Sequence, residues 1–225
     1  MKKLLAAIIA AALLLSGCSL SSRPAVSAPP AETPSPSPTP IVTPTPAPEP
    51  SDDELVLVRD YIPGIFIDLK YATTDNFTGR VIYDSDEAYL RYGTVKKLLC
   101  AQNELSGRGL SLKIWDAYRP VSAQFKLWEI CPNPVYVSDP NNGYSKHSRA
   151  NTVDITLVTS TGESIPMPSG FDDFTSLADR DYSDVSAEAA ENARLLESIM
   201  VENGFVPYSG EWWHYSDSVS YDVYG

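Results

Sequence analysis

A proline-rich stretch near the amino terminus limits how much of this chain can fold. Eleven of its 19 prolines lie between Pro24 and Pro50, among Ser, Thr and Ala, with almost no large apolar side chain. Such a segment cannot bury a core, so residues 19–50 are expected to form an extended, disordered tether. One domain is then expected at residues 51–225, which are enough for a real hydrophobic core.

Residues 1–18 have the features of an export signal. Two lysines precede an apolar run from Leu4 to Leu15 that is too short for a stable membrane span. The run ends in Leu15-Ser-Gly-Cys18, a pattern that resembles the lipobox of bacterial lipoproteins, in which the cysteine is lipidated. An ordinary signal peptide with an incidental cysteine is the alternative. We expect an exported protein, anchored through lipid on Cys18 to the outer face of the bacterial cytoplasmic membrane or held in the periplasm.

Charge and cysteine content narrow the possible partners. The chain carries 17 basic and 29 acidic residues, a formal net charge of -12, and a strongly acidic domain repels nucleic acid and anionic membrane. A small or zwitterionic ligand is the expected partner, and the oligomeric state stays open. Beyond Cys18 the chain has Cys100 and Cys131, which in an exported protein either pair or remain free thiols.

The order of predicted elements indicates an α+β fold, with a mainly antiparallel sheet and flanking helices. Hydrophobic periodicity and turn residues define the elements. Helices are expected at residues 94–105, 122–130 and 186–202, and strands at residues 55–58, 65–69, 110–114, 153–158 and from 205 onward. The Pro/Asn/Gly-rich residues 132–144 are expected to form a loop.

Both histidines of the chain lie near carboxylates. Asp154 follows His147 by seven residues, and Glu211 precedes His214 by three. Two imidazoles and one carboxylate can form a three-ligand zinc site with the fourth position left for water. A second carboxylate that does not bind the metal is what a zinc hydrolase needs as its general base. Two unrelated polar histidines are the alternative, and the paired placement favours the metal site.

Strand geometry sets a condition on this site. Asp154 is expected on a strand, next to the loop that carries His147. Glu211 and His214 are three residues apart, so a regular strand would point them to opposite faces. Both reach one metal only if a bulge lies between them or the strand begins after Glu211.

Six motifs follow one another along most of the chain from Asp60 to Tyr215. They are Tyr71-Ala-Thr-Thr-Asp-Asn-Phe-Thr-Gly79, Trp115-Asp-Ala-Tyr-Arg-Pro120, Ser145-Lys-His-Ser-Arg149, Val153-Asp-Ile-Thr-Leu157, Phe171-Asp172 and Glu211-Trp-Trp-His-Tyr215. In this order they resemble the VanX-type D-alanyl-D-alanine dipeptidases, zinc peptidases that share a fold with the hedgehog signalling domain. The resemblance implies a zinc enzyme that hydrolyses D-Ala-D-Ala to two D-alanines, in glycopeptide resistance or in D-alanine scavenging.

The resemblance also implies a role for each residue of the site. The implied zinc ligands are His147, Asp154 and His214, the base is Glu211, the oxyanion group is Arg119, and the residues around the substrate's amino terminus are Tyr71, Ser145 and Asp172. One departure is Ala150, where the family usually has Gly.

Several alternatives stay open at this point. Arg119 can instead be a structural ion-pair residue. Asp172 can instead be a loop-capping aspartate, and the neighbouring Asp173 can be the carboxylate that binds the substrate amine. Trp212 and Trp213 are expected in the core or the pocket wall. The alternative functions are a D,D-carboxypeptidase or a tetrapeptide-trimming carboxypeptidase on cell-wall stem peptides, and a non-catalytic, lipid-anchored cell-wall binder.

Overall fold

The computed structural model of the chain describes residues 48–225. The export signal, Cys18 and most of the tether lie outside these residues, so those predictions stay predictions. The elements in chain order are β1 (Leu55–Leu57), α1 (Val58–Tyr61), β2 (Phe66–Ile67), η1 (Lys70–Ala72), β3 (Tyr89–Arg91), α2 (Tyr92–Ser106), β4 (Leu110–Asp116), α3 (Val121–Ile130), η2 (Lys146–Arg149), β5 (Thr152–Thr159), η3 (Ser176–Ala178), α4 (Ala187–Glu202), β6 (Phe205–Tyr208) and β7 (Glu211–Asp217).

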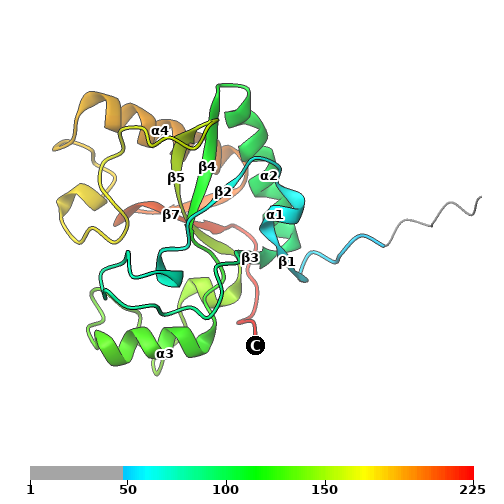
Figure 1. The fold of residues 1–225 in the computed structure, drawn as a ribbon, viewed down its shortest axis with the longest axis vertical. Helices are drawn as coiled ribbons and strands as arrows, with labels where there is room; N and C mark the ends of the chain where they lie inside the picture. The colour runs from blue at the N-terminus through cyan, green and yellow to red at the C-terminus, as the bar shows by residue number, and fades with distance from the viewer. Residues whose placement is uncertain (1–47) are drawn as a thin grey trace, which may run out of the picture. The chain divides into compact units, whose positions relative to one another are not determined.

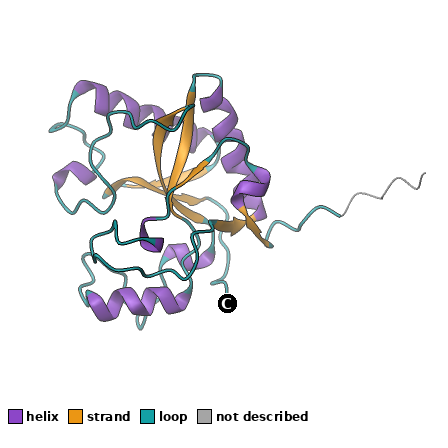
Figure 2. Ribbon diagram, in the orientation of Figure 1, coloured by secondary structure: helices purple, strands orange, loops and turns teal. Residues whose placement is uncertain are grey.

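A five-stranded sheet in the order β2-β4-β5-β7-β6 forms the centre of the domain (Figures 1 and 2). β2 runs parallel to β4, whereas β4–β5, β5–β7 and β6–β7 are antiparallel pairs. β1 and β3 form a separate antiparallel pair. The predicted α+β fold, with a mainly antiparallel sheet and flanking helices, is confirmed.

Helices α2 and α4 pack against the sheet because each carries an apolar stripe. Leu98 and Leu105 of α2 are fully buried, as are Leu196 and Met200 of α4. In each helix the buried residues recur at helical spacing, so one face points to the sheet, where Ile114 of β4 is also fully buried. Figure 1 shows α2 and α4 beside the upper part of the sheet and α3 below it.

Polar side chains from three neighbouring strands lie at one level of the sheet. Asp116 of β4 pairs with Asp154 of β5, and Asp154 pairs with His214 of β7. Directly paired residues point to the same face of a sheet, so these three side chains are neighbours. A register irregularity between Ile114 and Asp116 precedes this row on β4. The sheet thus places a row of ionisable groups where the candidate site lies.

Short elements depart from the predictions. The strand expected at residues 55–58 ends at Leu57, and Val58 already begins α1. β3 has no predicted counterpart, because three residues that lead directly into a helix are too few to show alternation. Cys100 and Cys131 are both free thiols, so the disulfide alternative is not found in the described domain. None of the helices in residues 48–225 has the length and apolarity needed to cross a membrane.

Candidate active site

Three buried side chains from three elements converge on one point. His147 comes from η2, Asp154 from β5 and His214 from β7, and their ligand atoms all lie within 4.8 Å of one another. His147 Nε2 is 3.2 Å from Asp154 Oδ2, and His214 Nδ1 is 2.9 Å from Asp154 Oδ1. Atoms bound tetrahedrally to zinc at about 2.1 Å lie roughly 3.4 Å apart, close to these separations. The three residues therefore fit a zinc ion.

The orientation of His147 supports this fit. Its Nδ1 lies 2.9 Å from the carbonyl oxygen of Ala117, which can only accept, so Nδ1 carries the proton and donates. In the neutral ring, Nε2 then presents a lone pair toward the oxygens of Asp154. Lone pairs facing each other in a buried site require a cation or an additional proton between them. Metal-ligating histidines are typically held by such a hydrogen bond through the other ring nitrogen.

Charge in the triad is balanced between the imidazoles and nearby carboxylates. Burial alone raises the pKa of Asp154, but the His147 and His214 rings outweigh it and hold that pKa below its ordinary value. Burial lowers the pKa of His147, and the carboxylates of Asp154 and Asp116 outweigh it, so the net pKa is raised. The site thus keeps Asp154 ionised, as a metal ligand must be.

Glu211 lies on the same side as His214 because β7 contains a bulge. Tyr208 of β6 pairs with Glu211, whereas the preceding Pro207 pairs with Tyr215. An advance of one residue along β6 therefore spans four residues of β7. The irregular segment brings Glu211 Oε2 to 3.4 Å from His214 Nδ1. Of the two arrangements that the sequence left open, the structure has the irregular strand, because β7 already begins at Glu211. Burial, followed by the charge of Asp154, raises the pKa of Glu211, which brings this carboxyl closer to the range of a general base at neutral pH.

Arg119 is buried and held on several sides. Its Nη2 donates to Asp116 Oδ2 at 2.5 Å, and its Nη1 donates to Gln124 Oε1 at 3.0 Å. The guanidinium carbon lies 4.9 Å from the centre of the Tyr71 ring. Each terminal nitrogen of an arginine has two N–H groups, so within the described domain these contacts leave one on each for a ligand.

Asp116 belongs to the site, although the sequence motifs gave it no role. It is fully buried, accepts from the Tyr83 hydroxyl at 2.5 Å and from the backbone N–H of Ala117 at 2.9 Å, and lies 3.6 Å from His147 Nδ1. It thereby connects Arg119 to a candidate zinc ligand. Its position three residues before Arg119 in the Trp115–Pro120 motif is a signal that could have pointed to this pairing.

Tyr71 and Asp172 come from distant parts of the chain and meet at the site. The Tyr71 hydroxyl donates to Asp172 Oδ2 at 2.6 Å. Burial foremost raises the pKa of Asp172 to about 7, against the lowering effect of the Tyr71 hydrogen bond. The neighbouring Asp173 accepts instead from the N–H and hydroxyl of Thr175, at 2.9 and 2.6 Å. Of the two adjacent carboxylates, Asp172 is the one that bonds to Tyr71.

Ser145 lies by the metal-ligand group. Its side-chain oxygen accepts from the backbone N–H of His147 at 3.3 Å and so caps η2. It also lines a cavity of about 210 Å³ together with Glu211 and His214. A loop from α3 provides further walls of this cavity, including Tyr136. Ser145 is thus placed to orient a ligand histidine and to face the cavity.

Three further residues take positions that their types allow or favour. Ala150 ends η2 in the left-handed conformation, with φ 57°, and is fully buried, a position that favours glycine, the residue that the resemblance implies there. Trp212 and Trp213 are buried in the core, as expected, and Trp212 Nε1 donates to Ser169 Oγ at 2.9 Å.

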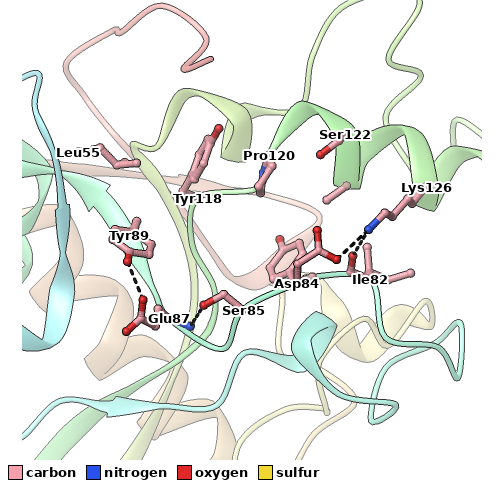
Figure 3. A pocket seen from close by; sticks show the side chains of 12 residues that line it. Leu55, Ile82, Asp84, Ser85, Glu87, Tyr89, Tyr118, Pro120, Ser122 and Lys126 are labelled. Carbon is pink, nitrogen blue, oxygen red and sulfur yellow. Dashed lines mark hydrogen bonds and ion pairs between the residues drawn. The ribbon is translucent and has the colours of Figure 1, made fainter.

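A separate cavity of about 270 Å³ lies away from the metal-ligand group (Figure 3). Figure 3 shows Lys126 directed at Asp84 and at the carbonyl of Ile82, and Tyr89 bonded to Glu87. None of the predicted site residues lines this cavity. The chemistry is therefore assigned to the smaller cavity that Glu211 and His214 line.

Comparison with known proteins identifies the family. The family model described as D-ala-D-ala dipeptidase matches residues 51–221. A D-alanyl-D-alanine dipeptidase of Escherichia coli is 40% identical over 162 residues, covering 72% of this chain and 83% of the relative. Those of Enterococcus faecium and Streptomyces coelicolor are 36% and 37% identical, covering 69% and 72% of this chain and 87% and 91% of the relatives. The chain therefore belongs to the D-ala-D-ala dipeptidase family and is a zinc metallopeptidase.

Proposed function

We propose that this protein hydrolyses the D-Ala-D-Ala dipeptide into two D-alanines. The observation that carries the proposal is one site that combines three buried metal-ligand side chains with a further, half-buried carboxylate, Glu211, and a buried arginine, Arg119. The relatives named as D-alanyl-D-alanine dipeptidases support the choice of substrate. The same chemistry serves glycopeptide resistance and D-alanine scavenging alike.

In this proposal His147 Nε2, the Asp154 carboxylate and His214 Nδ1 hold one zinc ion. When bound, zinc supplies a Lewis acid that polarises the scissile carbonyl and makes water a stronger acid. Glu211, beside His214, accepts the proton of the attacking water and returns it to the leaving amine. A raised pKa suits both steps, because the carboxyl must take up and release a proton near neutral pH.

Arg119 stabilises the negative charge that develops on the carbonyl oxygen. Its guanidinium is held in place by Asp116 and Gln124 before any substrate arrives, so little reorganisation is needed during the reaction. The structural ion pair of Arg119 and its role at the oxyanion are therefore compatible, because the ion pair fixes the orientation of the N–H groups that remain for the carbonyl oxygen.

Asp172 is the feature that favours a dipeptidase over a carboxypeptidase. A dipeptide carries an ammonium about one residue from the scissile bond, and burying that charge is costly without a paired carboxylate. Asp172, with Tyr71 donating to it, can provide the partner, and Ser145 can add a hydrogen bond to the substrate. A carboxypeptidase substrate continues as a neutral amide there and has no use for this carboxylate.

We also propose that the protein acts outside the cytoplasm, anchored by lipid on Cys18. The support is the Leu15–Cys18 pattern behind a short apolar run, followed by the proline-rich tether. This location would bring the enzyme next to the cell wall.

The experiment that tests the function compares D-Ala-D-Ala, N-acetyl-D-Ala-D-Ala and a stem pentapeptide with purified, zinc-loaded protein. We expect rapid release of D-alanine from the first substrate alone, because blocking the amine leaves Asp172 without its partner. Comparable cleavage of the blocked substrates would replace the dipeptidase proposal with the carboxypeptidase one. Binding of wall peptides without any cleavage would favour the non-catalytic binder.

A further inference from the structure

Three aromatic side chains from separate loops form a row beside the site, with the middle ring in contact with the other two. Phe77 lies between η1 and β3, Tyr136 between α3 and η2, and Phe174 between β5 and η3. The ring centroids of Tyr136 and Phe174 are 4.5 Å apart, and those of Phe174 and Phe77 are 5.3 Å apart. Phe174 is therefore the central member that connects the other two. We call these three side chains the aromatic bar.

The core does not require Tyr136 or Phe174, although Phe77 packs partly against it. Tyr136 is 46% exposed and Phe174 is 43% exposed, whereas the core residue Trp212 is fully buried. Contacts between such rings contribute only about 0.5–1.5 kcal/mol beyond the area that they bury. Single changes in the bar should leave the fold intact, so its position calls for a reason other than stability.

The ends of the bar lie on the walls of two cavities that hold the proposed catalytic and binding groups. Tyr136 lines the cavity of about 210 Å³ with Glu211, and Phe77 lines a second cavity, of about 420 Å³, with Asp172. Phe174, which contacts both rings, follows Asp172 by two residues. The bar thus runs from the metal-ligand side of the site to the side that holds Asp172.

We propose that the aromatic bar sets the upper size limit of the peptide substrate, an inference that rests on the proposed dipeptidase function. A dipeptide placed with its scissile bond at the metal ligands would bring its amine to Asp172, two residues before Phe174. A longer peptide continues from that nitrogen, and each added residue extends the chain by about 3.3–3.6 Å. In this proposal the joined rings obstruct the path of the added residue.

The bar and Asp172 exclude longer substrates in different ways. Asp172 disfavours any substrate that lacks an ammonium at that point, whatever its size. The bar excludes substrates that are too long, whatever charge they carry. A tripeptide lacks the ammonium at Asp172 in every variant, so a change in its relative rate when a ring is removed reports on the bar.

The test measures the ratio of kcat/KM for L-Lys-D-Ala-D-Ala to kcat/KM for D-Ala-D-Ala, using the full zinc-loaded protein. Phe174→Ala and Tyr136→Ala should each raise this ratio by about tenfold or more, the order that pocket shape contributes to selectivity. Phe125→Ala is the matched control, because Phe125 is an aromatic residue on α3, 39% exposed, that lines neither cavity. It should leave the ratio and both rates unchanged.

The outcomes separate this inference from the proposed function. Failure of the wild type to cleave D-Ala-D-Ala would reject the function itself. Cleavage of D-Ala-D-Ala with the same ratio in wild type, Phe174→Ala and Tyr136→Ala, at unchanged melting temperature, would reject the bar alone. Equal cleavage of both substrates by the wild type would also reject it. So would an equal loss of both activities in folded variants, because the rings would then act on catalysis and not on size.

Discussion

Replacing Asp116 with asparagine should destabilise the domain and slow the reaction together. Asp116 is fully buried and the Arg119 side chain is 10% exposed, with Nη2 at 2.5 Å from Oδ2. Asparagine keeps the shape but removes the charge, and its amide cannot satisfy both Arg119 and Tyr83 as acceptors. Removing one partner of a buried ion pair lowers the free energy of unfolding by about 3–5 kcal/mol. For a domain of this size, about 2–4 °C per kcal/mol gives a fall in Tm of roughly 6–20 °C.

The assay combines thermal unfolding with kinetics on D-Ala-D-Ala. Below its Tm, Asp116→Asn should show a kcat lower by about 10²-fold, because Arg119 is no longer held toward the carbonyl oxygen. Asp84→Asn is the matched control, since Asp84 forms an exposed ion pair with Lys126 at 3.2 Å and should change neither quantity measurably. A Tm for Asp116→Asn within about 2 °C of wild type would refute the reasoning, because the buried pair would then carry little of the fold's stability.

The remaining predictions concern the metal, the base, the substrate amine and the anchor. His147→Ala and His214→Ala should each lose most bound zinc by metal analysis, and full stoichiometry in either variant would reject that residue as a ligand. Glu211→Gln should retain zinc but lose a factor of about 10² or more in kcat; a zinc-loaded variant of normal activity would show that another group is the base. The pKa values of Glu211 and Asp172 are both raised, the latter to about 7, and each group acts when ionised, so kcat/KM should rise with pH as both lose protons. Asp172→Asn should remove one of these two protonation steps, and an acid limb of unchanged steepness would argue against a role for Asp172. Cys18→Ala should release the protein from membranes or leave its precursor uncleaved, whereas a processed protein that still partitions with membranes would rule out lipidation at this residue.

The elements with regular periodicity could be predicted from the sequence. The helix expected at residues 186–202 is α4, and Ser186 caps it by accepting from Ala189 N. Local spacing suffices for such elements, because each turn repeats the same environment. It also showed that Glu211 and His214 need an irregularity in β7 or a later strand start, but it did not decide between the two.

Other features depend on contacts between distant segments, and local spacing carries little information about them. Tyr83 meets Asp116 across 33 residues, and Tyr71 meets Asp172 across 101. The motif places Asp116 three residues before Arg119, which is a signal for their pairing, but its burial beside a candidate metal ligand follows only from the fold. Such pairings are set by the sheet register, which is known only once the strands are placed.

The left-handed Ala150 restricts evolutionary change beside His147. Its φ of 57° costs about 1–2 kcal/mol for a residue with a Cβ, and more for a β-branched one. Its complete burial independently excludes long side chains, and asparagine, which tolerates this conformation, would bury an amide. The backbone conformation and the burial together allow only glycine and alanine at this position. Relatives should therefore have either glycine or alanine at this position, even where the sequence of the exposed loop before η2 differs among them.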